Sequence, residues 1–509
     1  MTCVEDKAAV QVTPAARKWI VFFSSVAMLM TTLDTTIANI ALPRIQNDLS
    51  LTNDQLAWIL TSYILANAVF MPLTGFLVDR FGKREVLLFS AAGFVVMSVL
   101  CGLSQNLSQL VVARALQGAA GAFLMPSTQS IILDIHTKAG YAKAVSVWSM
   151  GIIIGPILGP TLGGYLTEIG SWHWVFLINL PIGLFILIGL FVVLPKFPID
   201  LTRKVDLRGF LYLGLSVGLL QLMLDRGESN HWFDSWEVRL ELIFSVMFLA
   251  IFLIHTLGRR QPFIQLACFK DRNFLAAIVF ACTTTFFVYS TAALLPGYLQ
   301  GLMGYSVIDA GLLLMPRGVG MMFALLVLGR LPVAQNPRAY IAFGFSVQAV
   351  ALHFMCNYNT QIDSNYLIWT GFIQGLGSSF VFMPLNVLMY LTLAPKYQTD
   401  AASSLGLIRN LASGISISAA FTLFARDSQF FHSLLVEQIT PTRVLRGWPA
   451  LLPLDSVQGA WVLNMEITRQ AAMQSYINLF AAMEWLSIGI VAFLILTRKR
   501  TPKVSGALA

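Results

Sequence analysis

Two ionisable residues stand inside long apolar stretches of the sequence. Asp34 lies in the segment LDTTIANIALP, and Arg114 lies three residues before Gln117 in a later stretch. A charge inside a membrane is costly and usually marks a proton or ion pathway. At 1.5 Å per residue, Asp34 lies about 12 Å below the outer end of its predicted span, and Arg114 lies about 10 Å below the outer end of its own. The two residues are at matching depth, so they can pair. A carboxylate whose pKa is shifted by burial and by a neighbouring cation can take up and release a proton. A static salt bridge between two helices is the alternative.

The composition shows what must position these residues. The chain of 509 residues is 57% hydrophobic and only 11% charged, with a mean hydropathy of +0.72, whereas soluble proteins carry about 25% charged residues. A membrane-spanning helix needs about 20 mostly apolar residues. We therefore predict an all-α membrane protein with fourteen spans, near 18–42, 55–77, 86–103, 108–132, 143–166, 174–194, 208–224, 238–257, 273–299, 308–329, 339–356, 367–393, 401–425 and 476–496.

The distribution of basic residues orients the predicted spans. If the N terminus is inside, the inner segments carry 23 Lys and Arg residues and the outer loops carry six, four of them in a long outer loop at 426–475. Cytoplasmic loops are enriched in Lys and Arg. We therefore expect both termini to be cytoplasmic, and the net charge of +8 to reflect membrane topology and not nucleic-acid binding.

An internal repeat divides the chain into two halves. Gln117 and Gly118 are followed by Met125-Pro126, and Gln374 and Gly375 are followed by Met383-Pro384 at nearly the same offset. This spacing makes the fourth span equivalent to the twelfth. Two six-helix halves with substrate bound between them form a known transporter architecture. We predict one bundle at 1–195, two inserted helices at 196–260, and a second bundle at 261–509.

The loop after the second span combines glycines with charged residues. It reads GFLVDRFGKRE. Its second glycine permits a tight turn, and its aspartate can cap the next helix or pair with a helix end. An ordinary basic inner loop is the alternative. We expect these residues to form a conformational switch: Gly75, Asp79, Arg80, Gly82, Lys83 and Arg84.

The fifth span is unusually rich in glycine and proline. It reads GIIIGPILGPTLGGYL. Proline removes a backbone donor and loosens a helix, whereas glycine lets a second helix approach closely. Ordinary small-residue packing is the alternative. We add these residues to the predicted switch: Gly155, Pro156, Gly159, Pro160, Gly163 and Gly164.

The loop, the glycine-proline span and the Asp34 span together resemble the major facilitator superfamily, and within it the fourteen-span drug:proton antiporters of the EmrB–QacA type. Similar segments run along most of the chain, among them WILTSYILANAVFMPLTG and AASSLGLIRNLASGISIS. The counterpart of the signature loop in the second half is reduced to Gly329-Arg330, and Arg317 is not a general feature of the family.

The resemblance implies a function and a set of partners. It implies proton-driven efflux of hydrophobic compounds across a bacterial inner membrane by alternating access, with Asp34 and Arg114 coupling the proton. No cofactor beyond the proton gradient is expected. Besides the hydrophobic substrate and membrane lipid, a membrane-fusion adaptor and an outer-membrane channel are the implied partners. The expected substrate cavity contains Gln117, Arg317, Gln374 and Arg409. Hydrogen bonding between helices is the alternative role of the two arginines.

Other function classes find little support in the sequence. The chain has no phosphate-binding G-x-x-x-x-G-K-[ST] loop and no HExxH motif, so neither ATP hydrolysis nor zinc-peptidase chemistry is predicted. Its five cysteines are scattered, so no metal site is predicted. An exporter of an anionic metabolite, a fatty acid or a siderophore remains the alternative, since Arg317 and Arg409 suit an anion.

Overall fold

The computed structural model describes residues 12–492 except for 52, 137, 170, 200–205, 228–229, 231, 260–265, 394–396 and 438–456. The regular secondary structure of the described part is entirely helical, with no strand. An all-helical chain suits a bilayer, because a helix satisfies its own backbone hydrogen bonds. The expected all-α fold is confirmed, whereas the predicted positions of both termini lie outside the described residues.

The first group of helices, here called the N-terminal bundle, runs from α1 to α9. It consists of α1 (Pro14–Asp48), α2 (Asn53–Phe70), η1 (Met71–Leu73), α3 (Thr74–Phe81), α4 (Lys83–Gly102), α5 (Leu107–Gly121), α6 (Leu124–Ile135), α7 (Lys138–Ile169), α8 (Trp174–Leu177) and α9 (Asn179–Val193). Proline lacks a backbone N–H and interrupts helices. The second and fourth predicted spans are accordingly broken near Pro72 and Pro126.

Two helices connect this bundle to the remainder of the chain. They are α10 (Leu207–Arg226) and α11 (Trp236–Leu257), joined through η2 (Trp232–Asp234). They pack against each other, and α10 also contacts α2 and α16. Asp206 begins α10 by accepting a hydrogen bond from the Gly209 amide at 3.0 Å. Many outward side chains of α11 are exposed, as expected for a helix that faces lipid.

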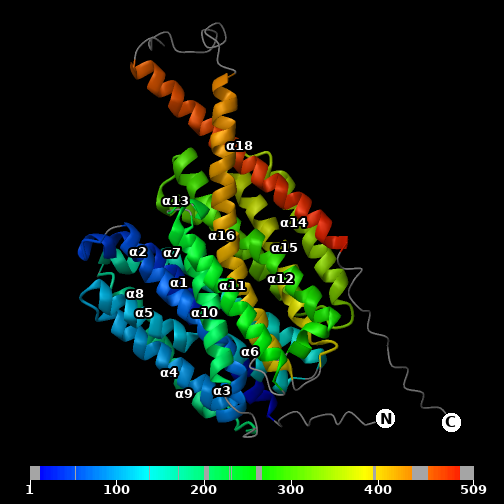
Figure 1. The fold of residues 1–509 in the computed structure, drawn as a ribbon. Coiled ribbons are helices and arrows are strands. Elements are labelled where there is room, and N and C mark those ends of the chain that lie inside the picture. The colour runs from blue at the N-terminus through cyan, green and yellow to red at the C-terminus, as the bar shows by residue number, and fades with distance from the viewer. Residues whose placement is uncertain are drawn as a thin grey trace, which may run out of the picture.

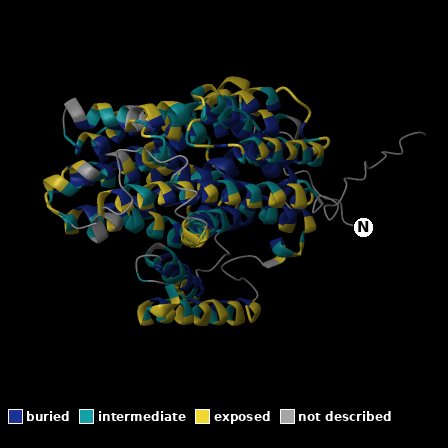
Figure 2. Ribbon diagram, turned by 90° about the horizontal axis from the view of Figure 1, so that it is seen from above, coloured by how far each residue is buried: buried dark blue, intermediate teal, exposed yellow. Residues whose placement is uncertain are grey.

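The second group, here called the C-terminal bundle, runs from α12 to α18. It follows η3 (Leu266–Lys270) and consists of α12 (Arg272–Gly297), η4 (Tyr298–Leu302), α13 (Val307–Leu328), α14 (Pro337–Met355), α15 (Ser364–Tyr390), α16 (Gln398–Glu437) and α18 (Val457–Ala492). Figure 1 shows the two bundles side by side, and Figure 2 shows buried residues along the inner faces of the helices and exposed ones outside.

Twelve of the described helices or helix pairs are long and apolar enough to cross a membrane. The twelve include the two connecting helices. The stretches predicted at 339–356 and 476–496 hold α14 and most of the described end of α18, but these two helices are not among the twelve. Fourteen spans are thus compatible with the structure and stay a prediction.

The segment at 426–475 differs from the predicted loop. Helix α16 continues to Glu437 and α18 already begins at Val457. Both project beyond the other helices at the top of Figure 1. A helix of 40 residues is about 60 Å long, twice the about 30 Å of a bilayer core. Hydropathy did not predict these helical ends, because it detects apolar segments that face lipid. Polar residues such as Gln429 and Gln470 also form helices well.

Candidate functional site

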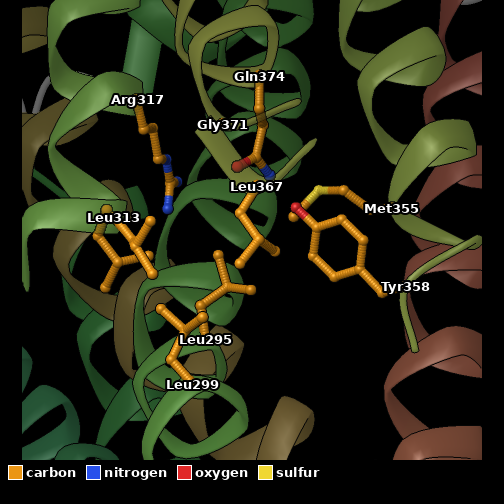
Figure 3. Close-up of a pocket in the computed structure, with 10 residues that line it drawn as sticks. Leu295, Leu299, Leu313, Arg317, Met355, Tyr358, Leu367, Gly371 and Gln374 are labelled. Carbon is orange, nitrogen blue, oxygen red and sulfur yellow. The ribbon is translucent and has the colours of Figure 1, made fainter. Parts of the chain in front are cut away.

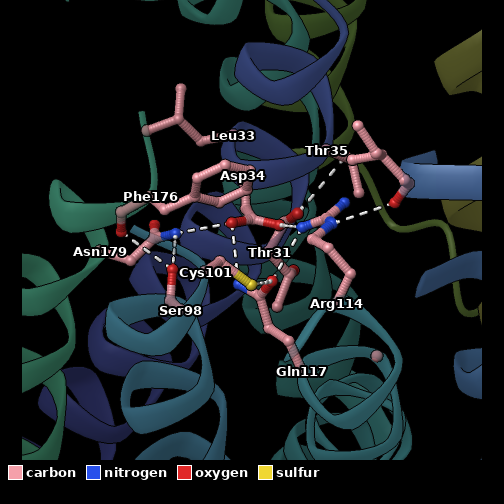
Figure 4. A network of polar contacts seen from close by, with 12 residues as sticks. Thr31, Leu33, Asp34, Thr35, Ser98, Cys101, Arg114, Gln117, Phe176 and Asn179 are labelled. Atoms are coloured by element: carbon pink, nitrogen blue, oxygen red, sulfur yellow. Dashed lines mark hydrogen bonds and ion pairs between the residues drawn. The ribbon is translucent and has the colours of Figure 1, made fainter. Parts of the chain in front are cut away.

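The structure brings Asp34 of α1 and Arg114 of α5 into direct contact. The Arg114 Nη1 atom lies 2.7 Å from Asp34 Oδ2. Gln117, one helical turn after Arg114, donates from Nε2 to Asp34 Oδ1 at 2.9 Å and accepts from Arg114 Nη1 at 2.8 Å. Asp34 is 1% exposed, and Arg114 and Gln117 are fully buried. The three side chains form one sealed polar network (Figure 4).

Further polar groups, which the sequence did not reveal, complete this network. Asn179, at the start of α9, donates from Nδ2 to Asp34 Oδ1 at 2.7 Å and to Ser98 Oγ at 2.9 Å. Arg114 Nε donates to the Ile59 carbonyl at 3.3 Å, and its guanidinium lies 4.4 Å from the centre of the Tyr63 ring. A lone amide inside the apolar stretch 174–194 was the signal that could have identified Asn179.

The network has a defined electrostatic character. Both oxygens of Asp34 accept hydrogen bonds, and one of them also pairs with a guanidinium. A buried ion pair is tolerated only when its remaining donors and acceptors are satisfied, and removal of one partner leaves an uncompensated charge. Protonation of Asp34 would remove its half of the pair. The arrangement can therefore couple a proton to the packing of α1 against α5 and α9.

The opposite side of α1 packs on the glycine-rich helix α7. A Cβ atom added at Gly155 would lie 2.1 Å from Thr32 Oγ1, and one at Gly159 would lie 2.2 Å from Thr36 Oγ1. The Thr36 hydroxyl also donates to the Gly155 carbonyl at 3.3 Å. These glycines allow an unusually close seam between α1 and α7.

Not all predicted residues of the glycine-proline span take part in this seam. Gly163 is buried, but a Cβ at Gly164 would meet nothing within 4 Å, so close packing is not the reason for a glycine there. Pro156 is exposed on α7. The side chain of Pro160 lies outside the part that the structure describes.

The signature loop forms the turn between α3 and α4. Gly82 has φ +91°, a conformation that L side chains rarely adopt, and it is the residue that precedes α4. Lys83 Nζ lies 2.5 Å from Asp134 Oδ2, and Arg84 Nη2 donates to the Phe191 carbonyl at 2.8 Å. The charged residues of the loop thus tie α4 to α6 and α9.

Three further loop residues lie within α3. Gly75 is buried, Asp79 is half-buried and Arg80 is exposed. Asp79 is not the cap of the next helix, because that position is occupied by Gly82. Helix α3 packs against α16. The loop is therefore adjacent to both bundles.

The four predicted cavity residues do not share one cavity. Gln117 belongs to the Asp34 network. Arg317 of α13 and Gln374 of α15 line a cavity of about 20 Å³ inside the C-terminal bundle, shown in Figure 3. Arg409 of α16 lies elsewhere, with its guanidinium 4.6 Å from the Phe382 ring and 3.5 Å from Asn386 Oδ1.

The two bundles touch at mid-depth and at the end where α1 begins, here called the basal end. Gln129 of α6 donates to Asn386 Oδ1 of α15 at 3.1 Å, and Asn410 of α16 donates to Asn67 Oδ1 of α2 at 3.0 Å. The Tyr141 and Tyr390 rings stack edge to face with centres 5.9 Å apart. These contacts join the two bundles from mid-depth to the basal end.

Known proteins resemble the chain over almost its whole length. It is 33% identical to the fatty acid resistance protein FarB of Neisseria gonorrhoeae, over 95% of each chain. It is 31% identical to the multidrug export protein EmrB of Escherichia coli K12, over 93% of this chain and 92% of that one. The crystal structure of the human organic anion transporter MFSD10 has the same fold, with a TM-score of 0.59, 13% identity, and coverage of 92% of this chain and 99% of that one.

A family model tests the predicted assignment directly. The model of the Major Facilitator Superfamily matches residues 24–417, which include the Asp34 network, the signature loop, the α7 glycines and the Arg317 cavity. The family predicted from the motifs is confirmed: the chain belongs to the Major Facilitator Superfamily and is related to the EmrB-type exporters.

Proposed function

We propose that the protein exports hydrophobic compounds across the inner membrane of a bacterium in exchange for protons. The observation that carries this proposal is the buried carboxylate of Asp34, which is 1% exposed and is held by Arg114, Gln117 and Asn179. A membrane carboxylate with such partners is typical of proton-coupled transporters. The relatives named for multidrug export and fatty acid resistance support export as the direction. We expect no cofactor besides the proton gradient.

The proposed mechanism is alternating access between two bundles, 1–195 and 261–509, joined by two inserted helices at 196–260. Contacts such as Gln129 to Asn386 hold the bundles together at the basal end, which we assign to the cytoplasm together with both termini. In this state the pathway is closed to the cytoplasm. Protonation of Asp34 frees α1 from Arg114, and the close seam with α7 passes this change to a helix that also contacts α13.

The switch residues have a place in this mechanism. The signature loop packs close to α16 through α3, so opening of the basal end must change its surroundings. Lys83 and Arg84 hold α4 to the N-terminal bundle as a rigid unit. We expect Gly155 and Gly159 to act as the surface on which α1 shifts.

The projecting ends of α16 and α18 suggest where partners bind. They extend from the end opposite the basal end, which the proposed orientation places in the periplasm. Exposed apolar side chains such as Phe430, Val457 and Trp461 lie on them. We propose that a membrane-fusion adaptor, itself joined to an outer-membrane channel, docks on these ends. An adaptor should copurify with the wild-type protein and should be lost when residues 428–467 are replaced by a short linker. Full export in cells without any adaptor would reject this role.

The decisive test of export is the variant Asp34→Asn in proteoliposomes. With an imposed pH gradient, the wild-type protein should concentrate ethidium against its gradient, whereas D34N should only equilibrate it. The matched control is Asp309→Asn, which removes a carboxylate from the first turn of α13, next to its cap Ser306. Uphill transport by D34N at the wild-type rate would reject the proposal.

A further inference from the structure

The cavity in the C-terminal bundle combines one buried cation with an apolar lining. It lies among α12, α13, α14 and α15 and has a volume of about 20 Å³. Its polar side chains are Arg317 and Gln374, which converge on it in Figure 3 together with the Tyr358 ring. The remaining side chains that line it are apolar: Leu295, Leu299, Leu313, Leu314, Met355 and Leu367.

The guanidinium of Arg317 is only partly satisfied. Arg317 is 9% exposed; its Nη2 atom donates to the Val288 carbonyl at 2.8 Å, but its Nε atom is buried without a partner. No carboxylate in the described part of the chain forms an ion pair with it. The fully buried Gln374 likewise has an Oε1 atom without a partner. Burial of an unpaired charge is costly, so it calls for an explanation.

The internal repeat provides that explanation. Gln117 donates to Asp34 in the N-terminal bundle, and Gln374, 257 positions later, donates at 3.4 Å to Thr291, which lies 257 positions after Asp34. The following glycines also match, since a Cβ at Gly118 would meet the Tyr63 carbonyl and one at Gly375 would meet the Arg317 carbonyl. Thr291 therefore occupies the position equivalent to Asp34.

The equivalent sites thus differ in one charged group. Both bundles hold a buried guanidinium beside a buried glutamine, but the C-terminal bundle has a threonine hydroxyl where the N-terminal bundle has a carboxylate. The position equivalent to Arg114 is Gly371, and the cation comes instead from Arg317 on the neighbouring helix. The C-terminal site has the cation of an ion pair without the anion.

We infer that this cavity binds the carboxylate of an aliphatic monocarboxylic acid, which supplies the missing anion. Guanidinium groups bind carboxylates through two parallel hydrogen bonds, and the free Nε of Arg317 is available for one of them. A half-turn of the Gln374 amide would present its NH₂ group as a further donor. The leucine and methionine side chains favour an aliphatic chain over a small hydrophilic anion. This inference rests on the proposed export function and names its substrate class.

The size of the cavity sets a condition on binding. A space of about 20 Å³ holds about one water molecule, so a ligand must displace side chains as it enters. Leu313 and Leu314 are only half-buried, and they lie one turn before Arg317 on α13. We expect these two leucines to move aside and then to contact the first methylene groups of the ligand.

The first experiment measures binding without any proton gradient. Full-length protein in lipid nanodiscs is titrated with radiolabelled decanoate, and decanol, decylammonium, acetate and chloride are tested as competitors. Arg317→Gln should weaken decanoate binding at least tenfold, whereas the matched control Arg330→Gln, an exposed site just after α13, should change it less than twofold. Equal binding by wild type and R317Q would overturn the inference. So would competition by acetate or chloride as strong as by decanoate, which would indicate a site for any small anion.

The second experiment adds the missing carboxylate to the protein itself. Thr291→Asp should pair with Arg317 and weaken decanoate binding at least tenfold, whereas Thr291→Asn, of similar size but neutral, should stay within about threefold of the wild type. A folded T291D protein that binds decanoate like the wild type would show that the carboxylate does not sit there. Neither experiment uses a gradient or a substitution in the Asp34 network, so loss of decanoate binding reports on this cavity alone. Proton coupling is measured separately with D34N, and failure of this inference is therefore distinguishable from failure of the proposed function.

Discussion

The Asp34 network and the Arg317 cavity occupy equivalent places in the two bundles, yet only the first is electrically complete. In the N-terminal bundle, a guanidinium and a carboxylate lie 2.7 Å apart and two amides complete their hydrogen bonds. In the C-terminal bundle, the guanidinium of Arg317 has a backbone carbonyl as its hydrogen-bond acceptor and faces a cavity. The same helical framework thus holds one site with a complete ion pair and one site, here called the open site, with a cation that has no anionic partner.

This difference indicates how a repeated fold can divide its tasks. A complete ion pair changes only when a proton is added or removed, whereas an unpaired cation changes when an anion arrives. Under the proposed function, the first site responds to protons and the second to substrate. The anion is present at Asp34 and absent at the equivalent Thr291, while the cation is supplied by Arg114 in one bundle and by the non-equivalent Arg317 in the other.

The largest expected effect tests the completeness of the N-terminal site. Arg114→Gln leaves the Asp34 carboxylate buried without its cation, which should lower the free energy of unfolding by about 3–5 kcal/mol. The double variant D34N/R114Q should recover most of this loss, because it removes both charges. Unfolding of the purified proteins in denaturant measures both effects. An R114Q protein as stable as the wild type would show that the pair does not stabilise this bundle.

Substitutions in the seam between α1 and α7, on the side of α1 opposite Asp34, should cause the next largest loss of stability. Gly155→Ala and Gly159→Ala place a methyl group within about 2 Å of a threonine hydroxyl, and such overpacking costs about 1–3 kcal/mol. Gly164→Ala on the same helix is the control, since its Cβ would meet nothing within 4 Å. Thermal unfolding should separate the three variants. Equal melting temperatures for G155A and G164A would contradict the close seam.

The open site should respond in the opposite direction. Arg317→Met removes a buried cation whose Nε atom has no partner, so we expect the free energy of unfolding to rise by about 1 kcal/mol in the absence of ligand. Unfolding in denaturant, run beside R114Q, tests the sign. A large loss of stability in R317M would mean that Arg317 is paired in the folded protein, and the contrast between the bundles would fail.

The smallest expected effect concerns a carboxylate outside the spans. Burial alone would raise the pKa of Asp206, but hydrogen bonds from His255 and the Gly209 amide and the charge of Arg259 hold it below its usual value of 3.8. A lowered pKa stabilises the folded state above that value, and the effect is lost as the pH falls through the lower folded pKa. Asp206→Ala should therefore cost about 1 kcal/mol at pH 7, as for other helix caps.

A comparison of melting temperatures across pH checks this sign. The difference between wild type and D206A should be full at pH 7 and should shrink below about pH 4. A constant difference across this range would show that the cap acts through packing and not through charge. In contrast with Asp34, this carboxylate should leave transport unchanged.

The charged residues of the Asp34 network could be predicted from the sequence, whereas its neutral polar residues could not. Asp34 and Arg114 stood out because charges are rare in apolar helices, and their depths matched. Asn179 and Ser98 did not stand out, because neutral polar residues are common in membrane helices. The role of Thr291 depends on how α12 is aligned with α15. The repeat relates only the fourth and twelfth spans, so it does not give this alignment. The helical ends of α16 and α18 were missed because hydropathy reports lipid contact and not helix length.

Proton counterflow in proteoliposomes tests the central claim most directly. A pH-sensitive dye is trapped inside, and an outward ethidium gradient is applied with the membrane potential clamped. The wild-type protein should move protons inward as substrate leaves. D34N should still let substrate run down its gradient but should move no protons, while D309N should behave like the wild type. Protons moved by D34N at the wild-type ratio to substrate would contradict the assignment of Asp34 as the coupling group.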